Sequence, residues 1–147
     1  MKLYFDTCCW NRPYDEHSQK KVYDEAVAIM RIIRQSRRRN ITILGSVTLI
    51  DEIGETGDAE KFVWITNLYK GAVTARANYN KGIFDKWEPL AETAGISGWD
   101  IYHLCYAESS GADYLLTTDK DFIKGAATLN TAVKVINPLN FPIGGIL

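Results

Sequence analysis

The stretch GADYLLTTDKDF, residues 111–122, places a strand signal, an acidic residue and a helix start in direct succession. Residues 113–118 are mostly apolar and β-prone, which predicts a short buried strand. Asp119 follows this strand, and a short helix is expected from about Lys120. Strands separated by helices favour a parallel sheet, because parallel neighbours cannot be joined by a tight turn.

The same alternation extends along the rest of the chain. Strands are expected at 2–6, 41–44 and 133–136, with a short ambiguous one at 72–75. Helices are expected at 19–38, 46–53, 58–71, 81–94 and 97–110, and loops at 10–18 and 141–145. This pattern predicts an α/β fold with a mostly parallel four- to five-stranded sheet and helices on both faces.

Bulk properties set the class of protein. The chain has 147 residues, of which 46% are hydrophobic and 24% charged, which predicts one domain over 1–147 with a real core. Met1 and Lys2 lead straight into a strand without a signal-peptide pattern, and no apolar run is long enough for a bilayer, so a cytoplasmic protein is expected. The three cysteines suit buried free thiols better than a disulfide framework.

Charge alone does not identify a partner. The chain has 17 basic and 18 acidic residues and a net charge of −1, so a nucleic acid would have to meet a local basic patch. Arg31, Arg34 and Arg38 share one side of a helix, where a solvated helix end is the simpler interpretation. Arg12, Lys120 and Lys124 are better candidates for phosphate contacts, since they lie nearer the acidic residues in the sequence.

Four acidic residues occur where an open α/β fold builds its ligand site. Asp6 and Asp119 end strands, Asp100 lies in the first turn of a helix, and Glu52 lies one turn into another. Carboxylates brought together at one sheet edge repel one another unless a cation separates them. A hard divalent cation such as Mg²⁺ or Mn²⁺ is the expected ligand, and Asp121 lies just behind Asp119.

Each acidic residue also has a purely structural interpretation. Asp6 and Asp119 would serve as helix caps. Asp100 would be stabilised by the helix dipole, and Glu52 would belong to a solvated helix face. As a set they favour a site, because an unpaired carboxylate closing a buried strand is costly. Nearby hydroxyls that would orient a carboxylate or a metal-bound water are supplied by three residues: Thr7, Thr117 and Thr118.

These residues resemble the motifs of PIN domains. The segment from Gly98 to Phe122 is similar to the C-terminal signature of that family, while the short YFDT (4–7) and DEI (51–53) segments resemble its first and second acidic motifs. The resemblance covers nearly the whole chain, and the C-terminal segment is its specific part. The chain departs from the usual pattern at Cys8, Cys9 and Trp99.

The resemblance implies a metal-dependent ribonuclease that leaves a 5′-phosphate. It identifies Asp6, Glu52, Asp100 and Asp119 as the acidic quartet, with Mg²⁺ or Mn²⁺ as the cofactor. Small members of the family are often VapC-like toxins of toxin–antitoxin pairs and often dimerise, which implies RNA, an antitoxin and a second copy as partners.

Two roles within this reading stay separate. Asp6, Asp100 and Asp119 or Asp121 are predicted as metal ligands, whereas the longer side chain of Glu52 suits a supporting or general-base role. The competing hypothesis is a catalytically inactive PIN-like scaffold that binds RNA or a protein. A phosphatase of the haloacid-dehalogenase type usually has a second aspartate two residues after the first, where this chain has Cys8.

Overall fold

The computed structural model describes residues 1–142 of the chain. The predicted domain extends to residue 147 and the predicted loop covers 141–145, so the last residues of both lie outside this range.

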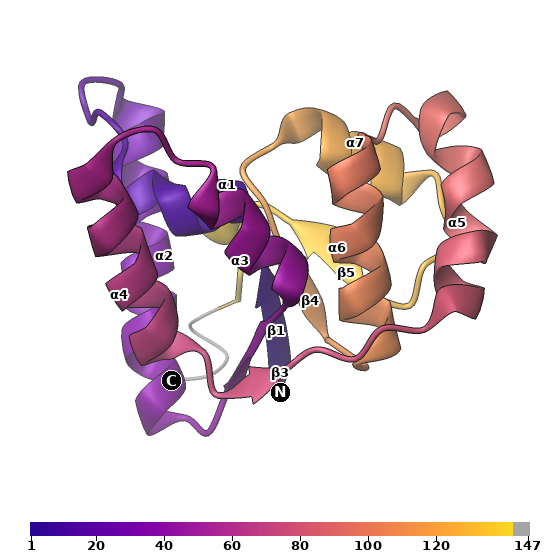
Figure 1. The fold of residues 1–147 in the computed structure, drawn as a ribbon, viewed down its shortest axis with the longest axis horizontal. Coiled ribbons are helices and arrows are strands. Elements are labelled where there is room, and N and C mark those ends of the chain that lie inside the picture. Colours follow the sequence, from indigo (N-terminus) through magenta and orange to yellow (C-terminus); the bar gives the residue numbers. More distant parts are fainter. Residues whose placement is uncertain (143–147) are drawn as a thin grey trace.

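A parallel sheet forms the centre of the molecule (Figure 1). Its five strands follow the order β3-β2-β1-β4-β5, and every neighbouring pair is parallel. The strands are β1 Lys2–Phe5, β2 Thr42–Gly45, β3 Ala75–Arg76, β4 Tyr114–Leu116 and β5 Lys134–Ile136. The strands expected at 2–6, 41–44, 113–118 and 133–136 are present with shifted ends. The ambiguous strand expected at 72–75 shares only Ala75 with β3, because α4 continues through Ala72.

Seven α-helices accompany the sheet in residues 1–142. Figure 1 shows the sheet between a group that includes α2 and α4 and a group that includes α5 and α6. Their bounds are α1 Thr7–Asn11, α2 Lys20–Arg38, α3 Val47–Gly54, α4 Ala59–Ala72, α5 Lys81–Ala94, α6 Gly98–Ser109 and α7 Lys120–Ala127. The architecture is the predicted α/β, PIN-like fold.

Local chemistry explains most helix boundaries. Ser46, Asp58 and Ser97 cap α3, α4 and α6 by accepting backbone N–H bonds in the first turn. Gly95 and Gly111 follow α5 and α6 with φ angles of 76° and 67°, a left-handed conformation that glycine adopts at little cost.

The predicted loop at 10–18 is wrong in its first half. Helix α1 extends to Asn11, and a 3₁₀ turn covers Arg12–Tyr14. Asp6 starts α1 by accepting the N–H of Cys9, and Trp10 is fully buried with its indole N–H donating to the carbonyl of Phe5. Tertiary burial of Trp10 therefore fixes a helix too short to be stable by itself.

Strand order determines where a ligand site can form. The chain passes from β1 to β2 on one side and later reaches β4 on the other side of β1. The carboxyl ends of β1 and β4 therefore border a topological switch point, where open α/β sheets hold their ligands. Asp6 follows β1 at this edge, and its N–H donates to the carbonyl of Leu116 at the end of β4.

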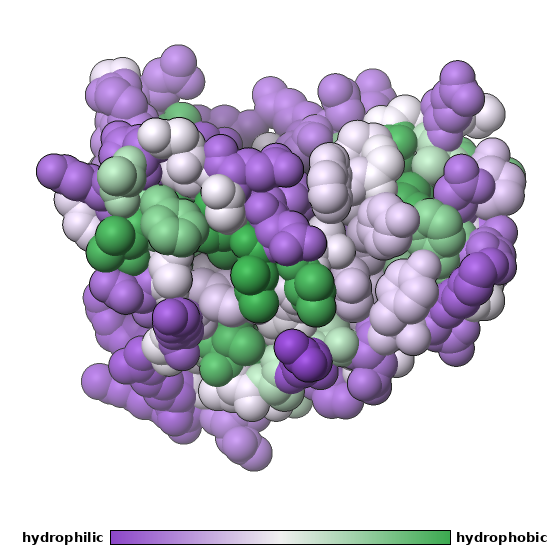
Figure 2. Space-filling view, viewed as in Figure 1, coloured by the Kyte–Doolittle hydropathy of each residue, from purple (hydrophilic) through white to green (hydrophobic). Residues whose placement is uncertain are grey.

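The molecule also has an apolar surface away from the sheet. Figure 2 shows hydrophobic side chains gathered over α3 and α4. The exposed residues there include Val47, Ile50, Phe62 and Val63. Among the helices of residues 1–142, none has the length and apolar character needed to cross a membrane.

Candidate carboxylate site

Asp6 is the deepest carboxylate of the candidate site, with 3% of its surface exposed. Its Oδ1 accepts hydrogen bonds from the N–H of Cys9 at 3.2 Å and from the thiol of Cys8 at 2.8 Å. Burial raises the pKa of Asp6 well above its ordinary value, and negative charge on Cys8 adds to this effect. Burial is the largest cause of this shift.

Asp100 lies in the first turn of α6, and its backbone N–H donates to the hydroxyl of the capping residue Ser97. Burial and the negative charges of Asp6 and Asp119 raise the pKa of Asp100 to about 6. Three predicted metal ligands from distant parts of the chain thus influence one another electrostatically. Their assignment as metal ligands stays a prediction.

Asp119 and Asp121 differ in their roles. Asp119 caps α7, with Oδ1 accepting the N–H groups of Asp121 at 2.9 Å and Phe122 at 3.3 Å. Both aspartates are exposed, but only Asp119 contributes to the raised pKa of Asp100. Asp119 is therefore a helix cap, as its structural interpretation predicted, and the choice between Asp119 and Asp121 for the fourth acidic place stays open.

Glu52 stands in a different environment on α3. Its Oε1 accepts a hydrogen bond from the Thr7 hydroxyl at 2.8 Å and pairs with Nε2 of His103. Partial burial by itself would raise the pKa of Glu52, but its hydrogen bonds to His103 and Thr7 lower it, and a protonated His103 would lower it further. Glu52 is thus an ionised carboxylate already supplied with donors.

The threonines divide between the site and its surroundings. Thr7 orients Glu52 rather than its neighbour Asp6. Thr117 accepts the N–H of Asp119 at 3.0 Å and its hydrogen bond to Asp6 lowers the pKa of that carboxyl in part. Thr118 accepts a hydrogen bond from the guanidinium of Arg12 at 3.0 Å.

Arg12 is held by the protein itself. One terminal nitrogen donates to Asp15 at 3.1 Å, the other donates to Thr118, and Nε lies 3.3 Å from the buried carboxylate of Glu25. A role for Arg12 at phosphate stays a prediction; both terminal nitrogens have protein acceptors, whereas the buried Nε forms an ion pair with Glu25 without a hydrogen bond among the described residues. Lys120 and Lys124 are exposed on α7, close in the chain to Asp119.

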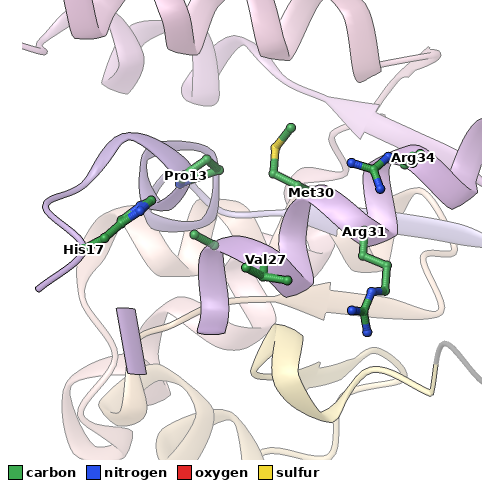
Figure 3. A pocket seen from close by; sticks show the side chains of 7 residues that line it. Pro13, His17, Val27, Met30, Arg31 and Arg34 are labelled. Carbon is green, nitrogen blue, oxygen red and sulfur yellow. The ribbon is translucent and has the colours of Figure 1, made fainter. Parts of the chain in front are cut away.

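The arginines of α2 lie at a separate pocket of about 260 Å³ (Figure 3). Arg31 and Arg34 line it, and none of the acidic quartet does. Arg31 and Arg34 therefore line a pocket that is separate from the carboxylate site.

The sequence did not identify the residues behind Glu52. His103 lies three residues after Asp100 on α6, and this i, i+3 spacing is the sequence signal that could have found it. Tyr4 and Ser46 carried no such signal, because one reads as strand core and the other as a helix cap. All three are buried and hydrogen-bonded in series.

The carboxylates have the chemistry that a divalent cation requires, but their spacing is too wide for one ion. The donors are carboxylate oxygens, the type that Mg²⁺ and Mn²⁺ prefer, and burial raises the pKa values of Asp6 and Asp100. Within residues 1–142, however, no three His, Cys, Asp or Glu side chains lie close enough together to hold one ion.

Comparisons with solved structures bear on the fold. A structure of VapBC2 from Rickettsia felis, bound to a DNA fragment from its promoter, matches with a TM-score of 0.62 and 13% identity over 92% of this chain and 98% of that one. FitAcB from Neisseria gonorrhoeae matches with a TM-score of 0.58 and 17% identity over 95% and 99% of the two chains.

A third match is PAE2754 from Pyrobaculum aerophilum, with a TM-score of 0.50 and 17% identity over 90% of this chain and 83% of that one. No family model and no curated protein matches the chain. At these identities the likeness is one of fold, and it agrees with the PIN-like architecture expected from the sequence.

Proposed function

We propose that the protein is a metal-dependent endoribonuclease that hydrolyses RNA phosphodiester bonds with Mg²⁺ or Mn²⁺. The observation that carries this proposal is the placement of Asp6 and Asp119 after the paired strands β1 and β4, where burial, together with their charges, raises the pKa of Asp100 to about 6. Three carboxylates that destabilise one another beside the switch point of a parallel sheet form a site for a cation. The step from cation to RNA rests on the resemblance to PIN domains.

The residues divide the chemistry between them. Asp6, Asp100 and Asp119 would hold the ion, with Asp121 as the alternative to Asp119, and these side chains must draw closer than they stand here to share it. A bound divalent ion lowers the pKa of a coordinated water and neutralises phosphate charge. Glu52, kept ionised by its donors, would take the proton of the attacking water.

Cleavage of single-stranded and hairpin RNA with Mn²⁺, Mg²⁺ or chelator tests the proposal. We expect metal-dependent cleavage by the native protein and its loss in Asp6→Asn, with 5′-phosphate ends on the products. Asp51→Asn is the matched control, because Asp51 is exposed and adjoins Glu52. Cleavage that survives both chelation and Asp6→Asn would overturn the metal-nuclease proposal.

An inactive PIN-like scaffold that binds RNA or a protein is the second candidate. The observation that favours it is the spacing of the acidic side chains, since no three of them within residues 1–142 lie close enough together to hold one ion. RNA binding without cleavage at saturating Mn²⁺ would support the scaffold. Mn²⁺-dependent cleavage by the native protein would remove it.

Protein partners belong to the same proposal. The exposed apolar residues of α3 and α4 form a contiguous surface of the kind that protein partners cover. A cytoplasmic toxin of this family would meet a second copy or an antitoxin there. The mass of the purified protein in solution, before and after Ile50→Glu, tests the homodimer, and co-purification with the product of an adjacent gene tests the antitoxin.

A further inference from the structure

A buried series of hydrogen bonds runs from the cap of α3 to the carboxylate of Glu52. Ser46 Oγ accepts the N–H of Leu49 at 3.2 Å and lies 2.8 Å from the hydroxyl of Tyr4. The Tyr4 hydroxyl lies 2.7 Å from Nδ1 of His103, and Nε2 of His103 meets Oε1 of Glu52. Residues from β1, α3 and α6 are thus joined by side chains alone.

Counting protons assigns a direction to this series. Oε1 of Glu52 accepts from the hydroxyl of Thr7 and also meets Nε2 of His103, and an ionised carboxylate only accepts hydrogen bonds. Nε2 of His103 must therefore carry a hydrogen. Nδ1 is then free to accept from Tyr4, whose oxygen accepts from the hydroxyl of Ser46, whose oxygen accepts from the N–H of Leu49.

The doubly protonated imidazole fits less well. Nδ1 would then donate to Tyr4, and Tyr4 would donate to Ser46, whose oxygen already accepts a backbone N–H. The Ser46 hydroxyl hydrogen would be left without an acceptor among residues 1–142. Tyr4, Ser46 and His103 are 0%, 2% and 1% exposed, so water does not offer a simple substitute. A buried unpaired donor is costly.

The two donors also distinguish the oxygens of Glu52. Thr7 and His103 both bond to Oε1, and Oε2 takes part in neither contact. Donors on one oxygen fix the orientation of a carboxylate while leaving the other oxygen available. Thr7 directly follows Asp6, and His103 lies one turn after Asp100 on α6, so both donors are built into segments that carry predicted metal ligands.

We propose that His103, held as its neutral Nε2–H tautomer by Tyr4 and Ser46, is the positioning residue of Glu52 and reserves Oε2 for the proton of the attacking water. This inference rests on the proposed function for its catalytic consequence. The tautomer itself is a property of the folded protein and does not depend on RNA cleavage.

Nitrogen-15 NMR of the imidazoles tests the tautomer directly. The chain has two histidines, so His17→Gln leaves His103 as the only imidazole signal, and His17 lies outside the carboxylate site. We expect Nε2 protonated and Nδ1 unprotonated near neutral pH. A doubly protonated ring, or the opposite tautomer, would overturn the assignment. Tyr4→Phe should broaden or shift the Nδ1 signal, because the ring loses its only partner there.

A double-mutant cycle with Glu52 tests the catalytic role. His103→Leu should lower kcat about 10- to 100-fold, the usual loss when a supporting partner of a site residue is removed, with KM and Mn²⁺ affinity unchanged. His103→Gln, which retains an N–H near Nε2, should recover most of the rate. In the Glu52→Gln background, His103→Leu should cause no further loss.

The outcomes separate the two proposals. Additive losses in the cycle, or no recovery in His103→Gln when it melts like the native protein, would show that His103 acts only on packing. If the native protein cleaves no RNA, the proposed function fails, and the NMR result alone decides whether His103 holds Glu52. Melting curves identify any variant that does not fold, in which case Tyr4→Phe supplies the kinetic comparison.

Discussion

Glu52 and Asp100 are two carboxylates of one candidate site that the protein treats in opposite ways. Glu52 receives donors from Thr7 and His103, and its pKa is lowered. Asp100 faces other carboxylates, and its pKa is raised to about 6. The protein supplies hydrogen-bond donors to Glu52, whereas burial and the charges of Asp6 and Asp119 oppose the ionisation of Asp100. On the proposed function, an external cation would serve Asp6, Asp100 and Asp119, which separates the ligands from the supporting base.

The largest effect that would sharpen this contrast is on cleavage. Asp100→Asn and Glu52→Gln should each lower the rate by about 100-fold or more, one through loss of the ion and the other through loss of a proton acceptor. Only Asp100→Asn should weaken Mn²⁺ binding measured by calorimetry. Equal loss of Mn²⁺ affinity in both variants would make Glu52 a ligand and erase the contrast.

Glu25 provides a third kind of carboxylate, buried and paired with a cation of the protein. Its Oε1 lies 3.3 Å from Nε of Arg12, and Asn137 donates to Oε2 at 2.5 Å. Arg12→Ala should lower the free energy of unfolding by about 3 kcal/mol, because it leaves a buried charge without its partner. Urea denaturation measures this loss, with exposed Arg39→Ala as the control.

A loss below about 1 kcal/mol in Arg12→Ala would contradict this structural role. The guanidinium of Arg12 would then be free to bind phosphate, as the sequence suggested.

The contrast also predicts opposite stability changes with pH. Asp100 has a folded pKa of about 6 against an ordinary value of 3.8, so without metal its ionisation opposes folding as pH rises from about 4 to about 6. Asp100→Asn removes this cost. We expect the variant to be more stable than the native protein by about 1–2 kcal/mol above pH 6, after allowance for solvent screening, and not in stronger acid.

Thermal melting across this pH range, in chelator, measures the difference. Saturating Mn²⁺ should stabilise the native protein and reverse the order of the two. A constant difference at every pH would show that Asp100→Asn acts through packing and not through removal of the carboxylate charge.

Glu52→Gln should give the smallest change, with the opposite sign. The pKa of Glu52 is lower in the folded chain, so its stabilisation is present above its unfolded pKa and is lost as pH falls through the folded value. We expect a loss of about 1 kcal/mol at neutral pH that disappears in acid, since the group is partly exposed. Melting of Asp51→Asn, an exposed neighbour, should follow the native curve.

Much of the fold was predictable because its signals are local. Ser46, Asp58 and Gly95 mark helix ends by their own chemistry, and apolar runs such as 114–116 mark buried strands. The helix at 7–11 was missed because its stability comes from burial of Trp10 against Phe5, a tertiary contact that no local pattern contains.

The candidate site was predictable only in part for the same reason. Asp6 and Asp119 follow strands, so the topology brings them to one edge, and that much is readable from the residues. The pairing of Glu52 with His103 joins positions 51 residues apart. Nothing in the sequence around either residue indicates the other, so the role of His103 emerges only from the folded chain.

The sheet has a consequence for how this protein meets other molecules. Its outermost strands, β3 and β5, are two and three residues long. So little free edge discourages a partner from adding a strand of its own and also limits edge-to-edge aggregation. Recognition must then use side chains displayed by helices, where a single substitution can change one contact without disturbing the backbone. Specificity for a partner is therefore free to diverge between related chains while the sheet stays the same.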